Sequence, residues 1–224
     1  MKINIAIDGP SAAGKSTIAK KLAARLHYIH LDTGAMYRCV GLKARENGID
    51  YNDEKALAEM LENTDIRLTS DGRVFLDGRD VSRDIRQDEI SLITSTVSRH
   101  PLIRENLVRR QQLLARDKGF IMDGRDIGTV VLKGAEVKVF MTASAEARAK
   151  RRYDQNIAAG LPTESLQEIT REIEQRDYQD MHRSVSPLRK AEDATEIDTS
   201  DMSIDEVTDA IYALVLPFCD KEGK

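Results

Sequence analysis

The first seventeen residues hold the feature that most restricts the fold: an apolar β-branched run, a glycine loop and a helix-forming segment. Residues 3–7 predict a buried strand, and the loop after it matches the pattern G-x-x-x-x-G-K-[ST] from Gly9 to Ser16. Glycines at this spacing let successive backbone N–H groups turn toward an anion, and the following helix directs its positive end to the same point. The segment therefore predicts a phosphate-binding loop (P-loop) for a nucleoside triphosphate.

Every residue of this loop is predicted to bind ATP. The residues are Gly9, Pro10, Ser11, Ala12, Ala13, Gly14, Lys15, Ser16 and Thr17. Lys15 is predicted to be catalytic, because its ammonium group can reach the β- and γ-phosphates. The Ser16 hydroxyl is the predicted protein ligand of Mg²⁺, whose other ligands are mostly water and phosphate oxygens.

Length and composition exclude several classes of protein. A chain of 224 residues with 41% hydrophobic residues can form one domain with inserts. No apolar run approaches the roughly 18 residues of a membrane span, and no secretion signal is evident. The two cysteines match no metal or redox spacing, so we expect a cytoplasmic protein. A net charge of −4 and 4% aromatic residues argue against nucleic-acid binding, and nothing demands more than a monomer.

Strand-like and helical segments alternate along most of the chain. The strand-like segments are residues 3–7, 28–31, 119–122, 137–141 and 195–198. This alternation predicts an α/β fold with a central parallel sheet, which binds ligands at the carboxyl ends of its strands. We expect the aspartates that follow three of these strands, Asp8, Asp32 and Asp123, to converge at that edge.

A different pattern interrupts the alternation. Residues 66–69 and 73–76 alternate with period two around Asp71-Gly72, which is a strong hairpin signal. Asp77-Gly78 makes a second turn. These segments predict a small antiparallel insert at about residues 64–84.

Two helices carry charge in a regular pattern. Arg148, Arg151 and Arg152 are spaced i, i+3, i+4, so they share one face of a helix. The next helix is predicted to start near residue 163 and to bury Leu166, Ile169 and Ile173. The same stripe continues to three charged residues, Arg176, Asp180 and Arg183. Buried charges are costly unless they are paired or meet a charged ligand, so each set is either a solvated face or part of a binding site.

Four segments together resemble the bacterial-type cytidylate kinases, a family of P-loop nucleoside monophosphate (NMP) kinases. They are residues 7–17 (IDGPSAAGKST), 31–38 (LDTGAMYR), 123–129 (DGRDIGT) and 176–183 (RDYQDMHR). The resemblance extends over almost the whole chain, and the third segment is its most specific part. It implies a three-layer P-loop NTPase fold with a central parallel sheet, an antiparallel insert in the NMP-binding region and a helical lid. The implied divisions are a core (1–38, 110–145, 184–224), an NMP-binding region (39–109) and a lid (146–183).

The resemblance implies transfer of the γ-phosphoryl group of ATP to CMP or dCMP, with Mg²⁺ as cofactor. The implied CMP-binding residues are Thr33, Tyr37, Arg38, Ser95, Arg104, Arg125, Asp126, Arg176, Asp180 and Arg183. The implied catalytic residues besides Lys15 are Arg125, Arg148, Arg151 and Arg152. Arginine forks suit phosphate oxygens, and the acceptor is already a phosphate, so no strong general base is needed.

Within this set, Arg38, Arg125 and Arg183 would hold the CMP phosphate. Asp126 would accept a hydrogen bond from the cytosine amino group, while Ser95 and Arg104 would donate to the ring acceptors. The alternative is a P-loop kinase for another small acceptor such as UMP, whose carbonyl would instead face Asp126. Asp32 and Asp123 could each orient magnesium-bound water or only cap a loop.

Overall fold

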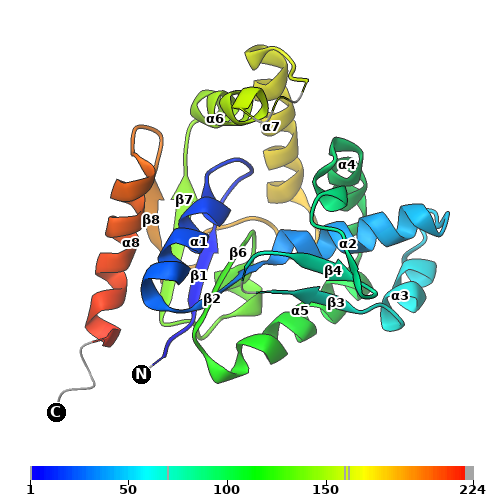
Figure 1. Cartoon of the computed structure of the whole chain (residues 1–224), viewed down its shortest axis with the longest axis horizontal. Coiled ribbons are helices and arrows are strands. Elements are labelled where there is room, and N and C mark those ends of the chain that lie inside the picture. Colours follow the sequence, from blue (N-terminus) through cyan, green and yellow to red (C-terminus); the bar gives the residue numbers. More distant parts are fainter. Residues whose placement is uncertain (1, 70, 159, 161, 220–224) are drawn as a thin grey trace. The chain divides into compact units, whose positions relative to one another are not determined.

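The computed structural model describes residues 2–69, 71–158, 160 and 162–219 of the chain (Figure 1). Two compact units make up the chain. Unit 1 comprises Met1–Tyr28 and Lys118–Lys224, and unit 2 comprises Ile29–Asp117. The finer division into core, NMP-binding region and lid stays a prediction.

A parallel sheet of five strands has the order β2-β6-β1-β7-β8. Its strands are β1 (Ile5–Asp8), β2 (Ile29–Asp32), β6 (Phe120–Gly124), β7 (Val137–Thr142) and β8 (Thr195–Asp198). Within unit 1, β1 is central: Ile7 pairs with Asp123 of β6 on one side and with Val139 of β7 on the other. The predicted central parallel sheet is confirmed, and Asp8 and Asp123 end neighbouring strands at the same edge.

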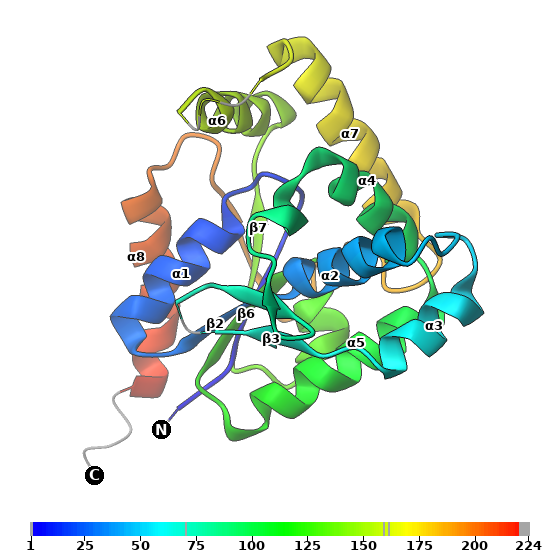
Figure 2. The same cartoon turned by 45° about the vertical axis from the view of Figure 1, so that its right-hand side comes forward.

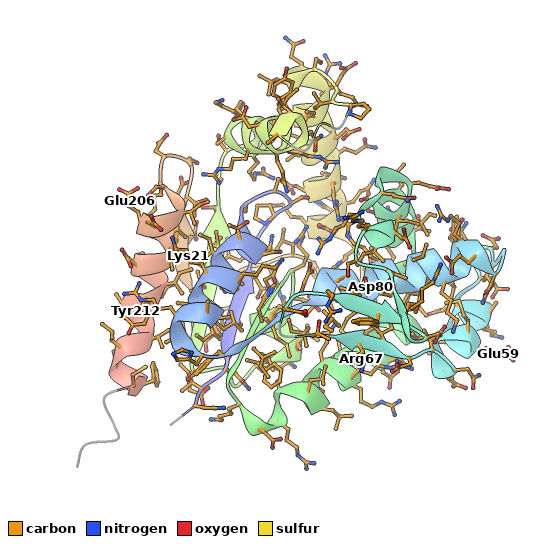
Figure 3. All side chains as sticks on the ribbon, viewed as in Figure 1. Lys21, Glu59, Arg67, Asp80, Glu206 and Tyr212 are labelled. Atoms are coloured by element: carbon orange, nitrogen blue, oxygen red, sulfur yellow. The ribbon has the colours of Figure 1, made fainter. Side chains whose placement is uncertain are left out.

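Two helices of unit 1 cover one face of this sheet. Helix α1 (Lys15–Leu26) and helix α8 (Ile204–Cys219) bury apolar side chains, among them Leu22 and Ile211, against the strands. Along the solvent side of their contact, Lys21 pairs with Asp205 and Arg25 with Asp209. The guanidinium of Arg25 also lies over the Tyr212 ring, 3.6 Å from its centroid. We call these five residues the α1–α8 seam, and Figure 3 labels Lys21 and Tyr212 on it.

Helices α6 (Ala145–Ala158) and α7 (Leu166–His182) lie against each other in both views (Figure 1 and Figure 2). Ile169 and Ile173 of α7 pack on Ala149 of α6, as the apolar stripe predicts. The predicted start near residue 163 and the predicted burial of Leu166 are wrong. Ser165 forms a capping box with Glu168, so α7 begins at Leu166, and this first-turn side chain is 46% exposed.

Unit 2 contains most of the other helices. They are α2 (Thr33–Glu46), α3 (Glu54–Glu62), α4 (Asp88–Val97), α5 (Pro101–Leu114) and the short turns η1 (Asp84–Arg86) and η2 (Ala115–Asp117). Asp32 and Asp53 cap α2 and α3 by accepting backbone N–H groups at 3.0 Å. Gly41 lets α2 and α4 approach closely, because a Cβ there would lie 3.2 Å from Ile93.

The small insert is an antiparallel sheet in the order β3-β4-β5. Its strands are β3 (Ile66–Leu68), β4 (Val74–Leu76) and β5 (Arg79–Asp80). Leu68 pairs with Val74 across the Asp71-Gly72 turn, which confirms the predicted hairpin. Figure 3 shows Arg67 and Asp80 on its two outer strands. No helix in the described part of the chain is long and apolar enough to cross a membrane.

Candidate active site

The P-loop follows β1 and is shaped by backbone conformations that its sequence permits. Gly9 has a φ of +150°, and a Cβ there would lie 2.2 Å from the carbonyl oxygen of Met141 on β7. Gly14 has a φ of +89° directly before α1, and Ala12 is also left-handed with a φ of +58°. Gly9 and Gly14 adopt their angles without strain, because they carry no Cβ. The loop therefore turns tightly around the positive end of α1, where an anion is stabilised.

Lys15 is buried beneath this loop, with 6% of its surface exposed. Its Nζ donates a hydrogen bond to the carbonyl oxygen of Pro10 at 2.6 Å. Burial, and then the positive charge of Arg125, lower the pKa of Lys15 to about 7. A bound phosphate would favour the charged form and raise this pKa again. The lysine is thus held ready for an anion.

Ser16 and Asp123 form the oxygen-rich part of the site. The Ser16 hydroxyl donates to Asp123 Oδ2 at 2.7 Å, and Asp123 is buried at the end of β6. Hydroxyl and carboxylate oxygens are the ligands that Mg²⁺ prefers, and this ion takes its remaining ligands from water and phosphate. These two residues therefore fit a magnesium ion that arrives with ATP.

Asp8 connects the P-loop strand to the segment after β6. Its two carboxylate oxygens accept the backbone N–H groups of Ile127 and Gly128, both at 2.7 Å. Burial raises the pKa of Asp8 to about 6, although the two N–H groups partly oppose this shift. Asp8 thus anchors the single helical turn η3 (Ile127–Val131), which directly follows Arg125 and Asp126.

Four predicted CMP-binding residues come together in unit 1, and we call them the α7 cluster. They are Arg125, Asp126, Asp180 and Arg183. Arg125 Nε donates to Asp180 Oδ2 at 2.8 Å. Arg183 lies 3.8 Å from Asp180 and 3.7 Å from Asp126, measured between charged atoms. The cluster is a chain of alternating charges with exposed fractions of only 6–19%.

Opposite charges within this cluster shift the pKa values of Arg125 and Asp180 toward their charged forms. Burial alone lowers the pKa of Arg125, but the carboxylate of Asp180 outweighs burial, so the pKa is raised above its ordinary range. Burial likewise raises the pKa of Asp180, while Arg125, Arg176 and Arg183 lower it overall. Arg125 and Asp180 therefore both stay ionised. Arg176, another residue that the resemblance implies for CMP binding, is thus one of the charges that act on Asp180.

The three predicted lid arginines on α6 have different surroundings. Arg148 is buried, and its guanidinium pairs with Asp177 of α7 at 2.5 Å. Arg151 donates to the hydroxyl and carbonyl oxygens of Thr199, in the loop that follows β8. Arg152 is half-buried. The structure thus connects Arg148 to α7 and Arg151 to the end of the sheet.

Unit 2 holds the other predicted CMP-binding residues. On α2, Thr33 and Tyr37 are buried, and Arg38 Nη1 donates to the Ile85 carbonyl at 2.9 Å and the Ser91 hydroxyl at 2.7 Å. Ser95 lies one turn after Ser91 on α4 and donates to its carbonyl at 3.3 Å.

The buried guanidinium of Arg104 lies over the Tyr37 ring at 5.2 Å and donates to Ser98 at 3.1 Å. Asp32 caps α2 and pairs with Arg86 at 2.9 Å. Asp32 thus caps helix α2, and its other suggested role, orientation of magnesium-bound water, stays a prediction.

Two residues escaped the sequence prediction. Ser91 shares a helix face with Ser95, so i, i+4 spacing could have indicated it. Asp177 stands beside Arg176 in the fourth motif, but its partner Arg148 is 29 positions away in the sequence. No local pattern reports that contact.

Comparison with known proteins agrees with this geometry. The cytidylate kinase family model matches residues 5–216. The cytidylate kinase of Caldicellulosiruptor bescii is 54% identical over 216 residues, which cover 95% of each chain. That of Bacillus subtilis strain 168 is 52% identical over 217 residues, which cover 96% of each chain.

Among solved structures, a gluconokinase from Sinorhizobium meliloti has a similar fold. The TM-score is 0.51 at 12% identity, over 98% of this chain and 95% of that chain. At this identity the likeness concerns the fold alone. Family membership follows instead from the sequence match across both P-loop and α7 cluster: the chain belongs to the cytidylate kinase family.

Proposed function

We propose that this protein transfers the γ-phosphoryl group of ATP to the phosphate of CMP or dCMP, forming ADP and CDP or dCDP. The observation that carries this proposal is the placement of the P-loop beside the Arg125–Asp126 segment. Asp8, the last residue before the P-loop, pairs with Gly124, the last residue before Arg125, and it accepts the backbone N–H groups of Ile127 and Gly128. A loop that binds the donor phosphates and an arginine that suits the acceptor phosphate therefore start from neighbouring strands at the same edge of the sheet.

The transfer step needs positioning rather than a strong base. An oxygen of the CMP phosphate attacks the γ-phosphorus, and the bond to the β–γ bridging oxygen breaks as ADP leaves. A phosphate monoester has a second pKa of about 6, so the attacking oxygen is already deprotonated at neutral pH. The P-loop amides and Lys15 hold the donor phosphates, while Arg125 and Arg183 hold the acceptor phosphate.

The arginines of the α7 cluster can exchange their aspartate partners for the phosphate of CMP. In the structure, Arg125 pairs with Asp180, and Arg183 lies near both Asp180 and Asp126. The CMP phosphate can take over guanidinium donors, and the carboxylates become available as acceptors. Asp180 would then accept hydrogen bonds from the sugar hydroxyls, and Arg176 would donate to the sugar oxygens. Asp126 would accept from the cytosine amino group.

Residues of unit 2 supply the rest of the acceptor specificity. Arg38 is proposed to bind the CMP phosphate, with Thr33 and Tyr37 beside it on α2. Ser95 and Arg104 are proposed to donate to O2 and N3 of cytosine. Uracil would present a carbonyl to Asp126, and two acceptors would then face each other, so the UMP alternative is not favoured.

Magnesium is the proposed cofactor. Ser16 and Asp123 would hold the ion, Asp123 acting directly or through bound water. When bound, Mg²⁺ neutralises negative charge on the β- and γ-phosphates. The chain's own contribution is the hydrogen bond between Ser16 and Asp123, which presents two oxygen ligands beside Lys15.

The lid arginines are proposed to cover the ATP phosphates and to exclude water from the transfer. Arg148, Arg151 and Arg152 would do this from α6. We further propose that the protein acts as a cytoplasmic monomer, with ATP and CMP or dCMP as its partners and with no nucleic acid or membrane bound.

A coupled assay of ADP release tests the proposal. The purified protein is given ATP and Mg²⁺ with CMP, dCMP, UMP or AMP in turn. We expect turnover with CMP or dCMP and a kcat/KM for UMP at least about 100-fold lower, because a mismatched polar site leaves buried groups unpaired. The Lys15→Ala protein, prepared in parallel, controls for contaminating kinases. Equal turnover of CMP and UMP would contradict the base assignment, and no turnover with any cytidine nucleotide would contradict the function.

A further inference from the structure

A buried ion pair lies where α6 and α7 pack together. Arg148 Nη1 is 2.5 Å from Asp177 Oδ2, and the two side chains are 7% and 10% exposed. The pair lies next to the apolar contact of Ala149 with Ile169 and Ile173. Burying two charges costs more than their attraction commonly returns, so fold stability alone is a weak reason for this pair.

The same two side chains hold one residue of the P-loop from both sides. The Ser11 backbone N–H donates to Asp177 Oδ1 at 3.3 Å. The Ser11 carbonyl oxygen accepts from Arg148 Nη1 at 3.1 Å. The backbone of Ser11 is therefore fixed directly before Ala12, where the left-handed conformation turns the loop. The orientation of the following N–H groups depends on that turn.

The guanidinium of Arg148 is also fixed from its other side. Its Nε donates to the carbonyl oxygens of Ala143 at 2.9 Å and Ser144 at 3.3 Å. All these bonds use Nε and Nη1, and within the residues that the structure describes Nη2 makes no hydrogen bond. Nε and Nη1 of the guanidinium are thus held by protein, and Nη2 can donate to a ligand.

We propose that Asp177 is a positioning residue for phosphoryl transfer, which fixes the Ser11 backbone and aims Nη2 of Arg148 at the phosphates of ATP. The inference rests on the proposed function and deepens it, because it assigns a role to a residue that binds no substrate itself. Groups fixed before substrate binds need no reorganisation during the reaction, and a small misplacement lowers the rate steeply.

The test replaces the charge but keeps the shape. Asp177→Asn retains an oxygen for the Ser11 N–H and loses the ion pair with Arg148. We expect kcat with ATP and CMP to fall about 10- to 100-fold, while KM for CMP changes less than about twofold. The matched control is Asp154→Asn, since Asp154 pairs with Lys150 on the exposed face of α6. This control should keep the kcat and both KM values of the wild type.

A double-variant cycle separates positioning from a structural role. If Asp177 acts through Arg148, the protein carrying both Asp177→Asn and Arg148→Ala should have a kcat within about threefold of Arg148→Ala alone. Additive losses would overturn the proposal. A normal kcat for Asp177→Asn would also overturn it, even if the thermal midpoint fell, since that pattern belongs to a purely structural residue.

A second variant covers the case in which Asp177→Asn does not fold. Arg148→Lys keeps the positive charge, but one ammonium group cannot bridge Ser11 and Asp177 and still present a further donor in a fixed direction. We expect its kcat to be close to that of Arg148→Ala, and a kcat near the wild type would overturn the proposal. Failure of the proposed function looks different, because the wild-type protein itself would then not phosphorylate CMP.

Discussion

Two charged regions of unit 1 use the same residue types in opposite surroundings. In the α1–α8 seam, the side chains of the two ion pairs are 43–74% exposed. In the α7 cluster, the exposed fractions are 6–19%. Arginine is paired with aspartate in both regions, so the main difference between the regions is burial.

The difference in burial changes how much each ion pair contributes to the stability of the fold. An exposed pair contributes roughly 0.2–1 kcal/mol, since water screens both partners. A buried pair loses the hydration of both ions, and removal of one partner costs about 3–5 kcal/mol because the other stays behind uncompensated. The ion pairs of the α7 cluster therefore stabilise the packing of its segments only weakly for the desolvation they require. Their arginines are instead suited to bind an anion.

The largest effect is expected for the buried lysine of the P-loop. Lys15→Ala should lower kcat about 10³-fold, because a fixed donor to the phosphates is lost. Thermal unfolding should change little, since burial already disfavours the charged form of this side chain. The control is Lys20→Ala on the exposed face of the same helix. Comparable activity of the two variants would remove Lys15 from the site.

Arg125→Ala should lower kcat/KM for CMP about 100-fold, the size of a lost hydrogen bond to a charged group. It should also destabilise the fold by about 3 kcal/mol, because Asp180 is left uncompensated. Adding Asp180→Asn should restore the midpoint of unfolding without restoring activity. If activity returned together with stability, Arg125 would have only a structural role.

The pH dependence of stability should report Asp8. Its pKa is about 6 in the folded protein and 3.8 ordinarily, so the folded chain holds a proton that the unfolded chain has released between these values. The resulting stabilisation is present at low pH and is lost as pH rises through this window, by about 3 kcal/mol. Asp8→Asn cannot titrate. The free energy of unfolding of both proteins is measured in urea from about pH 4 to pH 6.5. As the pH falls, the free energy of unfolding of the wild type should rise relative to that of Asp8→Asn. If the two free energies change in parallel with pH, the raised pKa of Asp8 is excluded.

Asp126→Asn should alter specificity more than rate. An amide can donate to O4 of uracil, which a carboxylate cannot, so the CMP/UMP ratio of kcat/KM should fall about tenfold. An unchanged ratio would remove Asp126 from base recognition and leave it as the partner of Arg183 alone.

The smallest effect is expected in the α1–α8 seam. Arg25→Ala removes the pair with Asp209 and the contact with the Tyr212 ring, so unfolding free energy should fall by about 1 kcal/mol. Activity should not change. A loss as large as that of Arg125→Ala would show that exposure does not separate the two regions.

The parts that were predictable from the sequence are those encoded locally. The P-loop from Gly9 to Thr17 follows from glycine spacing, and the Asp71-Gly72 hairpin from alternation around a turn. The start of α7 was misplaced because the capping box of Ser165 and Glu168 outweighs helix propensity in the residues before it. Leu166 is apolar, but it stands in a first turn that precedes the contact with α6.

The parts that were not predictable depend on contacts between distant segments. The role proposed for Asp177 depends on its contacts with Arg148 and Ser11, which come from two other segments of the chain. Asp8 was expected at the sheet edge, but its hold on Ile127 and Gly128 needs the parallel pairing of β1 with β6. Such contacts have no signature in sequence spacing.

Gly9 places the backbone of the P-loop in direct contact with the backbone of β7. Because a Cβ at this position would lie 2.2 Å from the Met141 carbonyl oxygen, the loop rests directly on the backbone of β7. No side chain separates the two, so the curvature of the loop is set by the distance between adjacent strands. On heating, the P-loop should keep its shape until β1 and β7 separate, and ATP binding should disappear together with the sheet rather than before it.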